Sequence, residues 1–131
     1  MISVLVGISA PRRVAMTAAS QLIPAHVAAQ LLVDTGASQT TLDKTIIAQL
    51  GIAPTGTISV HTPSTGSIPV NCAVYDVEIG LDGAAGQHIP TMPVAESDFS
   101  GQGIHGLLGR DFLRYGHMTY CGHMNVFYIS F

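Results

Sequence analysis

Charged side chains are scarce in this sequence. Only 10% of its 131 residues are Asp, Glu, Lys or Arg, whereas 47% are hydrophobic, and globular domains typically carry about a quarter of charged residues. A monomer with so few charges would leave much apolar surface in water, so this composition predicts a buried subunit interface. Lysine and arginine together number five and the formal net charge is -3. The basic surface of nucleic-acid-binding proteins is therefore missing, and we expect no nucleic-acid partner.

Long apolar runs are also missing. No stretch reaches the roughly 20 apolar residues of a membrane-spanning helix, so we expect no membrane partner. Residues 1–8 are apolar, but no positively charged segment precedes them, and Arg12 and Arg13 follow them instead. This order argues against a signal peptide, and the expected location is therefore cytoplasmic.

Cysteine is nearly absent. Cys72 and Cys121 are the two cysteines of the chain, too few for a disulfide framework in a domain of this size. Two reduced thiols are the favoured interpretation. The length suits one domain, and no repeat or linker interrupts it, so residues 1–131 are expected to fold as a single domain.

The sequence does contain many short β-rich segments separated by turns. Apolar alternation and β-branched residues predict strands at residues 2–8, 28–33, 40–42, 57–62, 68–79, 88–94, 104–109, 117–120 and 125–131. Pro90 and Pro93 limit strand 88–94 to an edge or irregular position, and residues 95–103 are expected to form a polar loop. This arrangement predicts a mainly β protein built as a closed or semi-closed barrel.

Two short helices are expected beside the strands, at residues 44–50 and 110–115. Asp43 is placed to cap the N-terminus of the first helix, and Gly51 is placed to end it. Residues 14–24 are ambiguous, because their alanines would support a helix while Pro24 limits it.

The strongest functional signal is the stretch Leu31-Leu32-Val33-Asp34-Thr35-Gly36-Ala37-Ser38. Its three apolar residues predict the end of a buried strand, where an ionisable side chain is costly to desolvate unless it is paired or hydrogen-bonded. The alternative is a turn with a purely structural role, in which the Asp34 side chain bonds its own backbone and Gly36 has a positive φ. The apolar run before Asp34, the small residues after it and a second motif late in the chain favour an active-site loop.

The second motif is Leu107-Leu108-Gly109-Arg110, followed by Asp111-Phe112-Leu113. Together with Asp34-Thr35-Gly36, it resembles the active-site sequences of retropepsin-like aspartic proteases, the single-lobed homodimeric kind, in its bacterial and cellular type. The resemblance runs from about residue 28 to the C-terminus. It implies a closed β-barrel of the acid-protease type, with two short helices and a flap hairpin.

The resemblance also implies a role for each residue of the first motif. Asp34 is the catalytic carboxylate, the Thr35 hydroxyl bonds across a dimer axis, and the Gly36 carbonyl accepts from a bound peptide. Ala37 and Ser38 continue the loop. Viral enzymes often carry an acid where Ser38 stands, so an ion pair with the arginine of the following helix is not implied here.

The second motif is implied to support the first. In the family, the segment matching Leu107, Leu108 and Gly109 crosses behind the catalytic loop. For Arg110 a binding role is conceivable, but we favour a structural arginine that bonds loop carbonyls at the dimer interface. Retropepsin-like dimers interleave their terminal strands, so we expect residues 126–131 at the interface rather than as a last core strand.

Peptide hydrolysis of this type needs two carboxylates that hold one water between them. One is ionised and the other protonated, because like charges at that range share a proton. The other acids considered lie in strands, turns or a helix and match no such loop: Asp76, Glu78, Asp82, Asp98 and Asp111. The second carboxylate must then be Asp34 of another copy, which predicts a homodimer.

A turn of small and polar residues lies where the family has its flap, between strands 57–62 and 68–79. Its residues are Thr62, Pro63, Ser64, Thr65 and Gly66. A flap closes over an extended substrate and excludes water. An ordinary exposed hairpin is the alternative interpretation of this turn.

The resulting hypothesis is an aspartic endopeptidase that acts on peptide or protein substrates and needs no cofactor. His117, Cys121 and His123 are close in sequence, but a fourth ligand is missing, so we expect no metal. Two alternatives remain open. The chain is a non-catalytic dimerisation or peptide-binding module on the same fold, or a protease active only in processing itself.

Overall fold

The computed structural model describes residues 1–61, 66–83 and 88–131 and leaves 62–65 and 84–87 undescribed. The strands within the described ranges are β1 (Ile2–Ile8), β2 (Val27–Val33), β3 (Thr41–Asp43), β4 (Gly56–Val60), β5 (Val70–Leu81), β6 (His88–Ser97), β7 (Gly106–Leu108), β8 (His117–Cys121) and β9 (Val126–Ser130). The helices are α1 (Ala10–Ala18), α2 (Lys44–Leu50) and α3 (Arg110–Leu113). No helix of the described part is long and apolar enough to cross a membrane.

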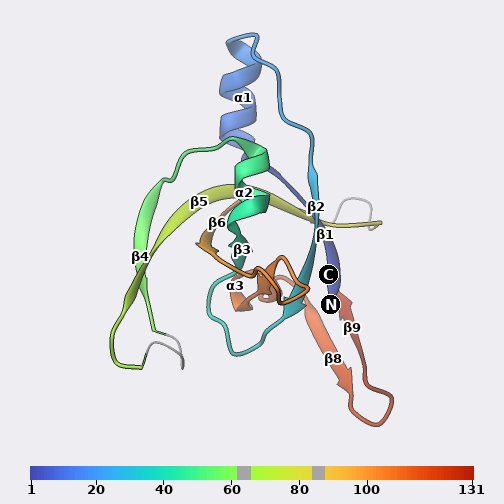
Figure 1. Cartoon of the computed structure of the whole chain (residues 1–131). Helices are drawn as coiled ribbons and strands as arrows, with labels where there is room; N and C mark the ends of the chain where they lie inside the picture. Colours follow the sequence, from blue (N-terminus) through green and yellow to red (C-terminus); the bar gives the residue numbers. More distant parts are fainter. Residues whose placement is uncertain (62–65, 84–87) are drawn as a thin grey trace.

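Six of these strands close into a barrel. The order in the sheet is β1-β2-β7-β3-β6-β5, and β1 pairs with β5 as well as with β2, which joins the two ends (Figure 1). The β2–β7 and β3–β6 pairs are parallel, whereas the remaining barrel pairs are antiparallel. The predicted mainly β fold with a closed barrel is confirmed.

The barrel core is built from alternate residues of its strands together with one face of α2. On β1, the buried side chains are Val4, Val6 and Ile8, as the two-residue period of a strand requires. On α2, Ile46, Ile47 and Leu50 are buried against the sheet. This helix lies where the sequence predicts it.

Both predicted ends of α2 are present. The Asp43 carboxylate accepts from the backbone N–H of Thr45 at 2.9 Å, and Gly51 ends the helix in the left-handed conformation. Asp43 also accepts from the backbone N–H of Phe99 at 2.7 Å, although it is almost completely buried. The hydrogen bond from the Thr45 side chain and these backbone donors outweigh burial and lower the pKa of Asp43.

The long strand β5 carries a hairpin outside the barrel. Its first part, from Val70 to Val74, pairs with β4, and its later part, from Val77 to Leu81, pairs with β1. The β4–β5 ribbon therefore extends away from the closed barrel (Figure 1). The hairpin is confirmed, but Thr62, Pro63, Ser64 and Thr65 of its predicted tip lie outside the described residues.

Strand β6 differs from its prediction. It lies between β3 and β5 and continues through Ala95 to Ser97, which the sequence placed in a loop. The prolines explain why an edge was expected, because proline cannot donate to a ladder. Pro90 and Pro93 both lie before the part of β6 that pairs with β3. Their missing N–H groups therefore remove no hydrogen bond from the β3–β6 pairing.

Helix α1 is a third helix beyond the two that were predicted. The ambiguous segment 14–24 is thus helical in its first part, and the helix begins before that segment. Proline fits the first turn of a helix, where its missing N–H costs nothing, and Pro11 occupies that place. The helix ends at Ala18, well before Pro24. None of its residues is fully buried, although Met16 packs against the core as a partly buried side chain.

An ion cluster attaches α1 to the barrel. The Glu78 side chain, on β5, accepts from the Arg13 guanidinium, and its Oε2 lies 3.2 Å from Nε2 of His26. His88 Nε2 lies 3.7 Å from Oε1 of the same carboxylate. Gly7 leaves the space for this cluster, because a Cβ there would lie 2.7 Å from the His26 ring.

The C-terminal strands form a separate hairpin rather than part of the core. β8 pairs with β9 alone, and the hairpin projects from the barrel (Figure 1). The register places four large apolar side chains on one of its faces, Met118, Tyr120, Phe127 and Ile129. None of them is buried, so residues 126–131 are not a last core strand.

Replacing Glu78 by Gln should lower the free energy of unfolding near neutral pH by about 1–3 kcal/mol, because Arg13 and His26 lose a charged acceptor. Burial alone would raise the pKa of Glu78, but the hydrogen bonds and charges of Arg13 and His26 outweigh it, so its pKa is lowered. A lowered pKa adds stability above the unfolded-state pKa, and this stability is lost as pH falls through the folded-state pKa. The difference between the two proteins should shrink over that range.

Urea unfolding at several pH values between neutral and about pH 3 measures this difference. The matched control is Asp82→Asn, which makes the same change at an exposed turn and should leave stability nearly unchanged. A Glu78→Gln difference that stays constant over the whole range would contradict the expectation.

Candidate active site

Strand β2 carries Asp34 directly after its last residue. The Asp34 backbone N–H donates to the carbonyl oxygen of Leu108 at 3.0 Å, so the pairing of β2 with β7 continues to this residue. Leu31 is fully buried, whereas Leu32 is 44% exposed. Because side chains alternate along a strand, Asp34 shares the outward face of Leu32. The half-buried carboxylate therefore lies at the rim of the barrel, facing away from the core.

The loop after Asp34 is held by its own carboxylate. Oδ1 of Asp34 accepts from the backbone N–H of Gly36 at 2.9 Å, and the Asp34 carbonyl accepts from Ala37 N–H at 3.2 Å. Asp34 thus bonds its own backbone, as in the turn that was the structural alternative, but the positive φ that this alternative expected of Gly36 is not found. A Cβ at this position would lie 3.1 Å from Asp34 Oδ1, a tight contact that the carboxylate would have to relieve by a shift of a few tenths of an ångström.

The second motif contacts this loop from behind. Leu107 and Leu108 pair in parallel with Leu32 and Val33. Gly109 lies against the chain that follows the loop, since a Cβ there would lie 2.7 Å from the carbonyl carbon of Gln39. Any larger residue at Gly109 would force the two segments apart. This close approach explains why glycine follows the two leucines.

Arg110 joins the first turn of α3 to the catalytic loop. Its Nη1 donates to the carbonyl oxygens of Thr35 at 2.8 Å and of Gly36 at 3.1 Å. Its backbone N–H donates to the Ala37 carbonyl at 2.9 Å. The guanidinium thus bonds loop carbonyls, as favoured from the sequence. It also uses the Gly36 carbonyl, which the resemblance reserves for a bound peptide, so substrate would have to share or displace this bond.

A polar link that the sequence did not reveal joins the far end of the loop to α3. Thr40 is fully buried, and its backbone N–H and hydroxyl donate to the Asp111 carboxylate at 2.8 and 2.6 Å. The Thr40 hydroxyl accepts from Gly109 N–H at 3.1 Å. Asp111 also accepts from the Phe112 N–H at 2.8 Å. Its carboxylate is occupied by the scaffold, which fits its exclusion as a second catalytic acid.

The remaining predicted residues occupy two places. Thr35 and Ser38 are exposed on the loop itself. Gly66 lies on the β4–β5 hairpin, exposed and with a φ of 62°. The structure thus brings Asp34, Thr35, Gly36 and Ala37 into contact with the second motif, while the predicted flap belongs to a separate ribbon.

Two further acids are engaged elsewhere. Asp98 accepts from Lys44 Nζ at 2.6 Å on the surface, and this bond lowers the pKa of Asp98. Glu78 belongs to the Arg13 cluster. Within residues 1–61, 66–83 and 88–131, no three His, Cys, Asp or Glu side chains are grouped as metal ligands. Cys121 Sγ lies 3.3 Å from Nδ1 of His123, and both cysteines are free thiols.

No curated protein sequence matches the chain. A model of the aspartyl protease family matches residues 23–112, a range that contains Asp34, the β4–β5 hairpin, β7 and most of α3. The match covers more than half of the chain, and it includes five of the six barrel strands, all but β1. The chain therefore belongs to the retropepsin-like aspartyl protease family.

Proposed function

We propose that this chain is an aspartic endopeptidase that works as a homodimer, with Asp34 of each subunit forming the catalytic pair. The observation that carries the proposal is the position of Asp34, at the rim of the barrel in a loop fixed by Leu108, Gly109 and Arg110. Such a loop supplies one carboxylate per chain, and the reaction needs two.

The reaction follows from the chemistry of such a pair. The ionised Asp34 takes a proton from the bound water while the water oxygen attacks the scissile carbonyl carbon. The protonated Asp34 of the other copy donates its proton to the carbonyl oxygen. The C–N bond of the tetrahedral intermediate then breaks as the first Asp34 passes its proton to the leaving nitrogen and a hydroxyl proton of the intermediate returns to the other Asp34, giving a free carboxylic acid and a free amine. One carboxyl group of such a pair stays protonated because two charges at this range cannot both form.

The C-terminal hairpin supports the dimer. Its apolar face exposes Tyr120, which is 61% accessible, together with Met118. Exposed apolar patches of this kind mark interaction surfaces. The hairpin follows α3, whose first residue, Arg110, bonds the catalytic loop, so a partner bound at the hairpin would lie near the incomplete site. The low charge content of the chain is consistent with the same interface.

The surroundings of Asp34 favour apolar side chains in the substrate. Leu32 precedes Asp34 on the same face of β2 and is 44% exposed. Leu107 is its register partner on β7 and is half-buried. These two leucines offer an apolar surface beside the carboxylate, so the proposed substrate is an extended peptide with apolar residues at the scissile bond. The β4–β5 hairpin, with Gly66 near its tip, is proposed as the flap that covers it.

Replacing Asp34 by Asn should abolish peptide cleavage while preserving the fold. The amide can still accept from Gly36 N–H but cannot take a proton from water, and losing a positioned acid or base costs about 10²- to 10⁴-fold in rate. Cleavage of a peptide library at mildly acidic pH measures the effect. Asp82→Asn should retain activity, and equal cleavage by wild type and Asp34→Asn would exclude the proposed mechanism.

Replacing Tyr120 by Asp should shift the protein toward monomer and lower its activity in parallel, because a carboxylate on the apolar face opposes burial. The matched control is Thr119→Asp, the neighbouring residue on the opposite face of β8. Sedimentation velocity and peptide cleavage at equal concentrations measure both effects. If both variants behave like the wild type, the hairpin is not the dimer surface.

A further inference from the structure

The segment between α1 and β2 contains a leucine whose side chain is almost completely exposed to solvent. Leu22 is 92% exposed, more than any other large hydrophobic residue in the described part of the chain. Val14, on α1, is the nearest comparable case in sequence, at 70%. Ile23 follows Leu22 and is half-buried against the core. The Leu22–Ile23 peptide bond therefore joins an exposed aliphatic side chain to one that packs against the core and must be released by local opening before a protease can bind it.

The backbone of this segment is free of regular structure. The N–H groups of Ala19, Ser20 and Gln21 still bond back to α1. From Leu22 to His26, no backbone-to-backbone hydrogen bond is recorded in the described structure. Exposed loops without such bonds are the preferred sites of proteolysis, because a protease binds its substrate as an extended chain.

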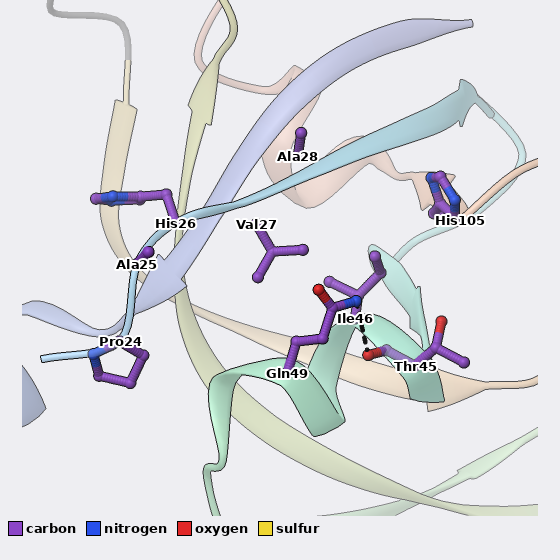
Figure 2. A pocket seen from close by; sticks show the side chains of 9 residues that line it. All are labelled: Pro24, Ala25, His26, Val27, Ala28, Thr45, Ile46, Gln49 and His105. Carbon is purple, nitrogen blue, oxygen red and sulfur yellow. Dashed lines mark hydrogen bonds between the residues drawn. The ribbon is translucent and has the colours of Figure 1, made fainter.

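One side of the segment is also poorly packed. Figure 2 shows Pro24, Ala25 and Val27 along a groove whose far wall is formed by Ile46 and Gln49 of α2. The groove has a volume of about 630 Å³. The chain after Ile23 therefore breaks few packing contacts on the groove side when it opens locally. Proteolysis of folded proteins proceeds through such openings.

From these observations we propose that the Leu22–Ile23 peptide bond is a site where this enzyme cleaves other copies of itself. The inference rests on the proposed function. Aliphatic residues on both sides of the bond match the apolar surface that Leu32 and Leu107 offer beside Asp34. Water adds to the Leu22 carbonyl carbon, the bond to the Ile23 nitrogen breaks, and the products are a Leu22 carboxylate and an Ile23 amine.

The fold dictates that this cleavage occurs between dimers. β2 separates the segment from Asp34, and its seven residues extend about 23 Å at the usual rise of a strand. Asp34 of the same chain contributes to the one site of its dimer, so that site is out of reach of its own Leu22. The initial rate per chain should therefore double when the protein concentration doubles.

The cut chain should remain assembled. β1 lies before the cut and pairs with both β2 and β5, and its Val4 and Val6 are fully buried. Residues 1–22 would therefore stay in the barrel without a covalent link to β2. The two fragments should elute together in native size-exclusion chromatography and separate only in denaturant.

The test is intact-mass spectrometry of the purified chain over time at mildly acidic pH. Wild type should yield fragments 1–22 and 23–131, and Asp34→Asn should stay whole. Leu22→Asp should reduce this cut by about 10-fold or more, because a charge replaces the aliphatic side chain at the scissile bond. Val14→Asp, an equal change at another exposed apolar position, should be cut like wild type.

A synthetic octapeptide with the sequence of residues 19–26 separates the possible failures. If wild type cleaves this octapeptide or a library peptide but leaves its own chain whole, the self-cleavage proposal is overturned and the proposed function stands. If it cleaves no peptide at all, the proposed function itself fails. A cut that also appears in Asp34→Asn overturns the proposal as well, because it comes from a contaminating protease.

Discussion

The narrow passage of β7 between β2 and β3 is the constraint on which the site depends. This three-residue strand pairs in parallel with β2 and antiparallel with β3, so it must approach both closely. Gly106 and Gly109 permit this, because a Cβ at Gly106 would lie 2.1 Å from the Thr41 carbonyl oxygen, and one at Gly109 would meet Gln39. The Asp34 loop is positioned by the same passage, through Leu108 and Arg110.

A second constraint is that this passage positions one carboxylate only. The other acids whose partners are described serve the scaffold: Asp43 caps α2, Asp111 holds Thr40, Glu78 binds Arg13 and Asp98 pairs with Lys44. The rigid half-site, the low charge content and the apolar face of the C-terminal hairpin have a common explanation in a second copy of the chain. Under this account, dimer formation and catalytic competence are the same event.

Local signals made much of the fold predictable. Asp43 and Gly51 mark the two ends of α2, because a carboxylate cap and a left-handed glycine act within one turn of the helix. Period-two alternation marks β1. The two motifs also pointed to segments that the structure brings into contact, although they lie about 70 residues apart in sequence.

Features that depend on tertiary contacts escaped the sequence. α1 buries no residue fully, so core packing gave no signal for it, and Pro24 limited the helix that the alanines of this region suggested. The prolines of β6 concealed its inner position, because they fall just before its pairing with β3. The Thr40–Asp111 link joins residues from two distant segments, and neither residue has a neighbour in sequence that signals it. For Gly36, a turn rule suggested a positive φ that the structure does not have; what the structure shows instead is a tight fit beside Asp34.

The central claim is that one catalytic site is built from two chains. The stoichiometry of a hydroxyl-containing transition-state-analogue peptide tests it most directly, since such analogues bind far more tightly than substrates. Native mass spectrometry or calorimetric titration should find one analogue bound per two chains, and none bound to a monomeric variant. One analogue per chain, or tight binding to a monomer, would contradict a site shared between two copies of Asp34.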